Sequence, residues 1–290
     1  MERLTYKRIG FFLKIAIAGT ILWLIFRKIN LNEVLSGFLD IKLPALVLLV
    51  ITTLLKLTIQ STNWNYCLKI NGDYQPIRGE VLRSFFIGTA LRFLLPGGHG
   101  TFGKAYYLSN SKKATLISVG IEKFLQTWIA LFTGSIAAAF FYRQLPLALR
   151  LGLVVVIGAL PWLLYLFSRI SKNEKVGGYS GNYLKIILPF AALQTAFIFI
   201  TVVQYYLVIS HFLEIGFIDM VVVVPLILLG NVIPISYAGL GVRESFAIHL
   251  LATYQVNSEI AVTASLFVFL LNSILPALAG VWFILTSKKR

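Results

Sequence analysis

The chain has 290 residues, of which 58% are hydrophobic and 13% are charged, and its formal net charge is +15 at pH 7. Apolar stretches recur from end to end without a long polar block, a composition typical of a polytopic membrane protein that leaves no room for a separate soluble domain. The basic residues stand in short clusters between the apolar stretches, where membrane topology places them, so the positive charge does not indicate nucleic acid as a partner.

Six apolar segments are long enough to cross a membrane as helices. Crossing requires roughly 20 predominantly apolar residues, and windows of that kind lie near 9–28, 43–62, 116–142, 147–168, 184–209 and 260–285. The first window begins with the apolar run Ile9–Leu13, too short for the core of a signal peptide, so we expect an uncleaved span. The stretch 31–40 has apolar residues at helical spacing, which predicts a short amphipathic helix at the membrane interface. We therefore expect an all-α fold with one integral membrane domain over residues 1–290.

Two shorter apolar segments, each interrupted by proline and glycine, stand between these spans. The first broken segment covers 84–104 and the second covers 220–244. They occupy corresponding places in two halves of the chain, about 1–142 and 147–290. Such a pair of interrupted segments points to a binding site near the middle of the membrane.

The distribution of basic residues predicts the orientation of the chain. With a cytoplasmic N-terminus, most Lys and Arg residues outside the spans fall on the inner side, so we expect both termini in the cytoplasm and the protein in the cell membrane. Three full spans separate the broken segments. If each segment is re-entrant, the two enter from opposite faces and the halves form an inverted, pseudo-symmetric pair. The alternative is that each completes a crossing, which gives eight spans. The charge distribution is the same in both cases, and we favour the re-entrant topology.

The loops of the two broken segments contain the residues expected to bind a ligand. Irregular backbone at membrane depth is tolerated only where protein buries it or where it lines a wet cavity, so the Gly-rich loop predicts a shaped cavity. After each break the helix can restart, with Thr101 and Ser236 as N-cap or turn residues and with Lys104 and Arg243 in the following turns. Free N–H groups at a helix start, joined by a cation, form an anion site.

The predicted site for a lipid headgroup consists of Gly97, Gly98, His99, Gly100, Gly103, Lys104, Ser236, Gly239, Gly241, Arg243 and Glu244. The alternative interpretation is that the glycines permit close helix packing and the cations anchor the interfaces. His99 is a lone histidine, for which a structural role is the simpler alternative. Glu244 either holds the Arg243 guanidinium in position or only stabilises its loop.

Other polar residues inside apolar segments are candidates for a polar path: Lys56, Arg92, Glu122 and Asn231. Lys56 shares a helical face with Gln60 and Asn63, so this polar stripe should face the bundle interior; the alternative is a lysine that snorkels to the membrane surface. Glu122 needs a cationic partner at its depth, either Arg92 or Lys104, and the pair is either structural or part of the lipid path. Asn231 and Asn272 would satisfy backbone groups freed at the second break. Cys67 is the only cysteine and no Cys/His cluster is present, so the sequence predicts no disulfide, metal site or cofactor.

Three motifs resemble a known family. In the second broken segment the motif is Pro234-Ile235-Ser236 followed by Gly239, Gly241 and Arg243-Glu244. In the first it is Pro96-Gly97 with Gly103-Lys104-Ala105 and Leu108, and Glu122-Lys123 opens the next span. These motifs resemble the transmembrane region of lysylphosphatidylglycerol synthases, also described as a flippase-like membrane domain, and the likeness covers essentially the whole chain.

The sequence departs from that family's pattern at three places. Lys104 stands where the family more often has Arg, Arg92 where an Asn is frequent, and Asn63-Trp64 where Arg-Trp is common. These departures alter the charge balance of the first half.

The resemblance implies transfer of lipids between leaflets. In the synthases, the membrane part flips aminoacylated phosphatidylglycerol made by a soluble domain, and we expect this chain to be a stand-alone form without that domain. We therefore expect a lipid translocase for an anionic or aminoacylated phospholipid, or a similar polar lipid. No ATP-binding motif of the GxxxxGK[ST] type is present, so transport would be downhill, ion-coupled or partner-driven, with Lys56, Glu122 and Glu244 as candidates for a coupling relay.

Two other functions stay open at this point. The chain would act as a membrane anchor or accessory subunit for a separate lipid-modifying enzyme, such as a glycosyltransferase, if it moves no lipid alone. An intramembrane enzyme would need a nucleophile or an acid/base pair; Glu122 and His99 are the only candidates and no spacing supports them, so we predict no catalytic residues. The sequence does not predict an oligomeric state.

Overall fold

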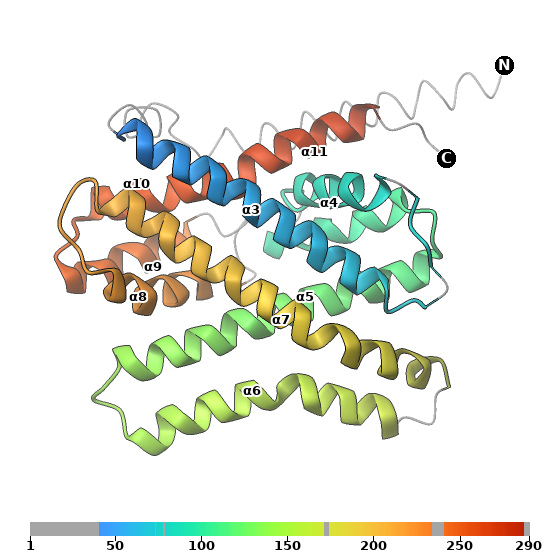
Figure 1. The fold of residues 1–290 in the computed structure, drawn as a ribbon. Helices are drawn as coiled ribbons and strands as arrows, with labels where there is room; N and C mark the ends of the chain where they lie inside the picture. The colour runs from blue at the N-terminus through green and yellow to red at the C-terminus, as the bar shows by residue number, and fades with distance from the viewer. Residues whose placement is uncertain are drawn as a thin grey trace.

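The computed structural model describes residues 41–72, 74–77, 79–94, 96–170, 174–233 and 241–286, and all regular secondary structure in these ranges is helical (Figure 1). The expected all-α fold is thereby confirmed. The predicted first span at 9–28 and the predicted interfacial helix at 31–40 lie outside the described residues.

Five helical segments are long and apolar enough to cross a membrane. They are α3 (Leu43–Leu68), α5 (Lys112–Phe141), the Leu147–Leu166 part of α6 (Leu147–Ile170), the Gly181–Ile209 part of α7 (Glu174–Ile209), and the run Ser258–Thr286. That last run consists of α10 (Ser258–Phe269), a π-helical turn η4 (Leu270–Ile274) and α11 (Leu275–Thr286). Each segment coincides with one of the windows predicted after residue 40.

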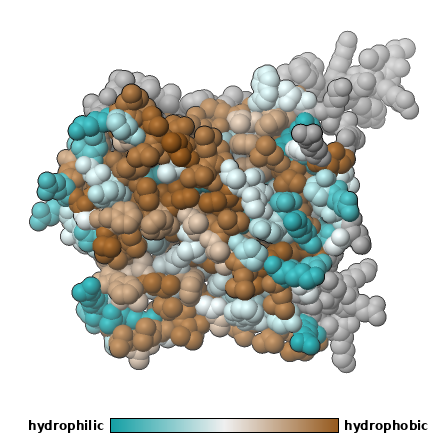
Figure 2. Space-filling model, viewed as in Figure 1, coloured by the Kyte–Doolittle hydropathy of each residue, from teal (hydrophilic) through white to brown (hydrophobic). Residues whose placement is uncertain are grey.

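Apolar side chains cover the outer surface of these helices. On α6, for example, Leu149, Val155 and Leu163 are exposed. Figure 2 shows apolar residues across the middle of the molecule and hydrophilic residues gathered toward its two sides. Hydrocarbon chains of a bilayer would cover such an apolar band, whereas the polar sides would meet headgroups and water.

The first broken segment forms a short α-helix followed by a 3₁₀ helix. Helix α4 (Glu80–Leu91) begins after Gly79, whose φ of 78° is left-handed, and η1 (Pro96–Tyr107) is a 3₁₀ helix that packs against α4. The close approach requires glycine, because a Cβ on Gly100 would lie 1.8 Å from the Leu91 carbonyl oxygen. Thr101, predicted as an N-cap or turn residue, is not the cap: it lies inside η1, which already begins at Pro96, a residue suited to the first turn of a helix.

The second broken segment also contains two short helices that pack against each other. Helix α8 (Phe217–Leu229) is followed by α9 (Val242–Leu251) and the short η3 (Ala252–Tyr254), and α8 packs against α9. The intervening residues 234–240 lie outside the described residues. In Figure 1, α4 lies toward the side of the molecule where α3 ends, whereas α8 and α9 lie at the opposite side, which α7 reaches before it turns into α8.

Helices α3 and α7 pack against each other in the centre of the bundle, with α5 in contact with both. Helix α11 packs along α4, and Gly280 allows this contact, because a Cβ there would lie 2.0 Å from the Phe86 carbonyl oxygen. The broken segments are thus held between long helices, and their interrupted ends meet a common space in the middle of the fold.

Candidate functional site

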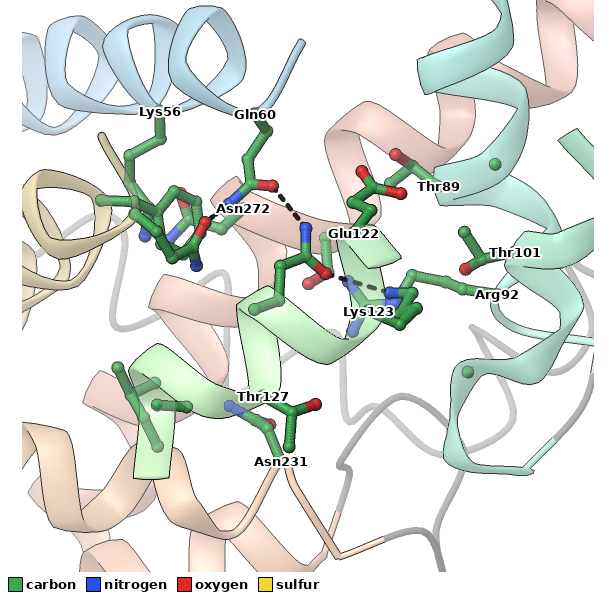
Figure 3. Close-up of a pocket in the computed structure, with 18 of the residues that line it drawn as sticks. Lys56, Gln60, Thr89, Arg92, Thr101, Glu122, Lys123, Thr127, Asn231 and Asn272 are labelled. Atoms are coloured by element: carbon green, nitrogen blue, oxygen red, sulfur yellow. Dashed lines mark hydrogen bonds between the residues drawn. The ribbon is translucent and has the colours of Figure 1, made fainter. Parts of the chain in front are cut away.

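A cavity of about 570 Å³ lies between α3, α4, η1, α5, α7 and the elements of the second broken segment. This volume is within the range of roughly 300–1,000 Å³ that is usual for ligand sites. Both broken segments contribute to its wall, the first through residues such as Gly98 and the second through Asn231 and Arg243. The cavity predicted from the Gly-rich loop is therefore present. Its polar and charged lining residues include Lys56, Gln60, Thr89, Arg92, Thr101, Lys104, Glu122, Lys123, Gln126, Thr127, Gln194, Thr201, Asn231, Arg243 and Asn272 (Figure 3).

Lys104, the cation of η1, is buried and paired. Its side chain is 2% exposed, and its Nζ forms an ion pair with Glu122 of α5. The ammonium also stands 3.5 Å from the centroid of the Trp64 ring, which favours a desolvated cation. Gly88 leaves the necessary room, because a Cβ there would lie 2.7 Å from Lys104 Cδ. Of the two partners predicted for Glu122, the structure selects Lys104.

Arg243, the cation of α9, has a parallel environment. Gly241, with a left-handed φ of 88°, opens the helix, and its N–H donates to Glu244 Oε2 at 2.6 Å. The Arg243 guanidinium donates to Glu244 Oε1 and, through Nε, to Ser265 Oγ at 2.8 Å. Its Cζ lies 4.6 Å from the centroid of the Phe269 ring. The predicted contact between Glu244 and the guanidinium is thus confirmed.

The two predicted poles of the site are therefore alike: each cation follows a break, pairs with a carboxylate and stands against an aromatic ring. Because an unpaired buried charge is costly, these carboxylates stabilise Lys104 and Arg243 at this depth. Both cations line the cavity, but each positive charge is already balanced within the protein.

Three further cations line the cavity without a carboxylate partner in the described part of the chain: Lys56, Arg92 and Lys123. Lys56 is 2% exposed and its Nζ donates to Thr201 Oγ1 at 2.7 Å and Gln204 Oε1 at 3.1 Å. The prediction that its polar stripe faces the bundle interior is confirmed, and the snorkelling alternative is wrong.

Amide side chains extend from two of these cations, Lys123 and Lys56, across the bundle. Lys123 Nζ donates to Gln126 Oε1 at 3.3 Å, and Gln126 Nε2 donates to Gln60 Oε1 at 2.9 Å. Gln60 Nε2 in turn donates to Gln194 Oε1 at 3.1 Å, so that α5, α3 and α7 share one chain of hydrogen bonds. On the other side of Lys56, Gln204 accepts a bond of 2.7 Å from Asn272 Nδ2. Asn272 therefore serves a side chain rather than the freed backbone group that we expected.

The interpretation of the sequence missed the polar residues of α7 that complete this network. Gln194, Thr201 and Gln204 follow one another at intervals of seven and three residues, which places them on one face of a helix. That spacing within a long apolar window is the signal that would have found them.

A comparison with protein families now bears on this geometry. The model of the family described as "Lysylphosphatidylglycerol synthase TM region" matches residues 11–280. The chain belongs to this family. The protein is accordingly a multi-pass membrane protein, and its family associates the membrane domain with lipid handling. No curated protein matches the chain.

The other predicted site residues of this lysylphosphatidylglycerol synthase TM region fall into two groups. Gly98, with a left-handed φ of 73°, and His99 line the cavity, and Asn231 lines it from the second broken segment. Gly100 and Gly103 instead allow η1 to pack on Leu91, as the alternative interpretation expected.

Three positions remain without an observation on ligand contact. Gly97 lies in the first turn of η1. Ser236 and Gly239 lie outside the described residues, so their assignment to the headgroup site stays a prediction.

Proposed function

We propose that the protein is a lipid translocase of the cell membrane that moves an anionic or aminoacylated phospholipid, or a similar polar lipid, between leaflets. The observation that carries the proposal is the polar, cation-lined cavity inside an apolar helical domain, with walls from both broken segments. Moving a headgroup through hydrocarbon is costly because its polar groups lose hydration. The side chains of the cavity would replace the lost water contacts during the passage. The proposal assigns transport to this chain and no catalytic step.

The lengths of the short helices support a re-entrant topology. Helix α4 has 12 residues and α8 has 13, which corresponds to about 18–20 Å at a rise of about 1.5 Å per residue, well below the roughly 30 Å of hydrocarbon in a bilayer. The two segments also lie toward opposite sides of the molecule (Figure 1). We propose that they are inverted re-entrant hairpins and that both termini are cytoplasmic. The cavity between them would then open to one leaflet at a time, as in transporters with inverted repeats.

A second hollow supports a lipid rather than a soluble substrate. An apolar groove of about 220 Å³ lies between α5, α7 and α8 and shares Ile198 with the polar cavity. Its lining includes Ala137 and Phe140 on α5, Phe199 on α7 and Val222 on α8. An acyl chain in this groove would remain in an apolar environment while its headgroup occupies the cavity.

The proposal is tested by measuring lipid translocation in proteoliposomes. Fluorescent phospholipids with different headgroups are placed in both leaflets, and a membrane-impermeant quencher reports the rate at which inner-leaflet lipid becomes accessible. The wild type should accelerate translocation of at least one headgroup. Thr127→Trp introduces bulk into the cavity (Figure 3) and should slow translocation by about tenfold or more, because a barrier raised by only about 1.4 kcal/mol lowers a rate tenfold.

Val155→Trp is the matched control, since Val155 is a lipid-exposed residue of α6, 69% accessible, and the substitution should leave the rate unchanged. Translocation of no lipid by the wild type would refute the proposal and favour an anchoring role beside a separate lipid-modifying enzyme. Equal slowing by both variants would show that the cavity is not the route.

A further inference from the structure

The cavity holds more positive charge than its own carboxylates balance. Five cationic side chains line it: Lys56, Arg92, Lys104, Lys123 and Arg243. In the described part of the chain, the carboxylates that form ion pairs with them are Glu122, with Lys104, and Glu244, with Arg243. Lys56, Arg92 and Lys123 form no ion pair there, and five cations against two carboxylates leave a formal excess of three positive charges around one space.

These cations lie close enough to act on one another electrostatically. Arg243 acts on Lys56 and on Arg92, and Lys123 has Arg92 and Lys104 as cationic neighbours beside the Glu122 carboxylate. Like charges gathered in a poorly hydrated interior repel one another strongly, and ionisable residues inside a membrane domain usually find a partner there. An anion in the cavity would attract the three unpaired cations and offset the repulsion among them.

The unpaired cations also retain hydrogen-bond donors. An ammonium has three N–H donors and a guanidinium has five. Lys56 uses two of its donors on Thr201 and Gln204, and Lys123 uses one on Gln126. Arg92 stands at the C-terminal end of α4 and lines the cavity, and the planar guanidinium suits bidentate contact with phosphate. In Figure 3 Lys56 lies at one side of the pocket and Arg92 and Lys123 lie at another, and all three line the same cavity.

We infer that the cavity selects headgroups that bear a multiply charged phosphate, either a phosphate monoester or a diphosphate, and rejects aminoacylated headgroups. This inference rests on the proposed function for the identity of the cavity as a lipid headgroup site. A phosphate monoester carries about −1.5 to −2 charges at pH 7 and offers three acceptor oxygens, which matches three unpaired cations. An aminoacylated headgroup adds positively charged amines, and the carboxylates that would receive them already serve Lys104 and Arg243.

The inference is tested by competition binding to the purified full-length chain in neutral detergent micelles. Radiolabelled phosphatidic acid, a phosphate-monoester lipid, is displaced by unlabelled phosphatidic acid, phosphatidylglycerol, lysylphosphatidylglycerol or glycerol 3-phosphate. We expect phosphatidic acid to bind most tightly and lysylphosphatidylglycerol at least about tenfold more weakly, because charge-assisted hydrogen bonds are lost and like charges approach. Equal affinity for these two lipids would overturn the inference.

Variants test whether the unpaired cations cause the preference. The double substitution Arg92→Gln with Lys123→Gln should weaken binding of phosphatidic acid by about tenfold or more and alter that of lysylphosphatidylglycerol far less. Arg92→Lys, which keeps the charge, should retain the order of affinities. An unchanged preference in the double variant would refute the assignment to these side chains, and the order in the wild type tests the inference even if that variant does not fold.

Three further outcomes separate this inference from the proposed function. Equal affinity for glycerol 3-phosphate and phosphatidic acid would show a site for soluble phosphates and overturn the assignment to a lipid. If the order of affinities holds but proteoliposomes translocate no lipid, the selectivity stands and the translocase proposal fails. If lipids are translocated without regard to headgroup charge, the translocase stands and the selectivity fails.

Discussion

Removal of the Glu122 carboxylate should destabilise the protein more than almost any other single polar substitution in it. Glu122 is 3% exposed and Lys104 is 2% exposed, so Glu122→Gln leaves a buried ammonium without its counter-charge. Breaking a buried ion pair in this way costs about 3–5 kcal/mol. The Trp64 ring, 3.5 Å from Lys104 Nζ, contacts the ammonium with or without the Glu122 carboxylate, so it does not change this difference. We therefore expect the free energy of unfolding to fall by about 3–5 kcal/mol.

The measurement is reversible unfolding in mixed micelles, titrated with a denaturing detergent, on wild type, Glu122→Gln, Lys104→Met and the double variant. Because the double variant removes both charges, its loss should be smaller than the sum of the two single losses. Glu214→Gln is the control, since Glu214 is an exposed loop residue and its loss should stay within about 0.5 kcal/mol. Additive single losses, or a Glu122→Gln loss of the control's size, would refute the pairing of these two residues.

Three further predictions follow from the packing, the amide network and a loop tyrosine. Gly100→Ala would place its Cβ 1.8 Å from the Leu91 carbonyl oxygen, so unfolding in the same titration should show a loss of about 1–3 kcal/mol. Gln204→Leu removes an acceptor of Lys56 and should lower the free energy of unfolding by about 1–3 kcal/mol and slow lipid translocation. Burial, with its hydrogen bond and charge neighbours, raises the pKa of Tyr74 to about 12. This folded-state pKa lies above the usual unfolded value of about 10. The stabilising contribution of the neutral Tyr74 hydroxyl is therefore full below about pH 10 and is lost as the pH rises toward 12. Tyr74→Phe should remove the phenolate absorbance that appears in this range.

Matched controls accompany the first two of these predictions. Gly152→Ala lies in α6, where a Cβ meets no atom within 4 Å, so it should be neutral or slightly stabilising. Gln144→Leu changes an exposed loop glutamine and should leave both stability and translocation as in the wild type. A Gly100→Ala variant as stable as Gly152→Ala would contradict the close approach of η1 to α4. Normal translocation by Gln204→Leu would show that transport does not depend on the hydrogen bond from Lys56 to Gln204. Tyr74 absorbance that appears near pH 10 would contradict its burial.

The sequence predicted those features that depend on local length and period. The spans after residue 40 were recognisable because long apolar windows have few alternatives, and the inward face of Lys56 followed from its spacing to Gln60 and Asn63. The Pro/Gly interruption likewise located the first break, because proline and glycine seldom continue a helix. The prediction of Thr101 as a cap was wrong because the sequence does not distinguish a cap from the interior of a 3₁₀ helix.

The partner of Glu122 could not be predicted, because it depends on contacts between elements that are distant in sequence. Glu122 had two candidate partners, and only the packing of η1 against α5 assigns it to Lys104. The same packing changes which cations a ligand would meet: Lys104 and Arg243 are balanced, while Lys56, Arg92 and Lys123 are not. The partners of Lys56 on α7 are also far away in sequence, since the distance from Lys56 to Gln204 is 148 residues.

The central claim, that a lipid headgroup enters the cavity at mid-membrane depth, can be measured by site-specific labelling. Cys67, the only cysteine, is buried, so the wild type gives the background for a phospholipid with a thiol-reactive headgroup. Thr127 lines the cavity near the middle of α5, and Val155 faces outward near the middle of α6. We predict labelling of Thr127→Cys in vesicles and only background labelling of Val155→Cys. Equal labelling of the two variants, or none of Thr127→Cys, would contradict the passage of headgroups through this cavity.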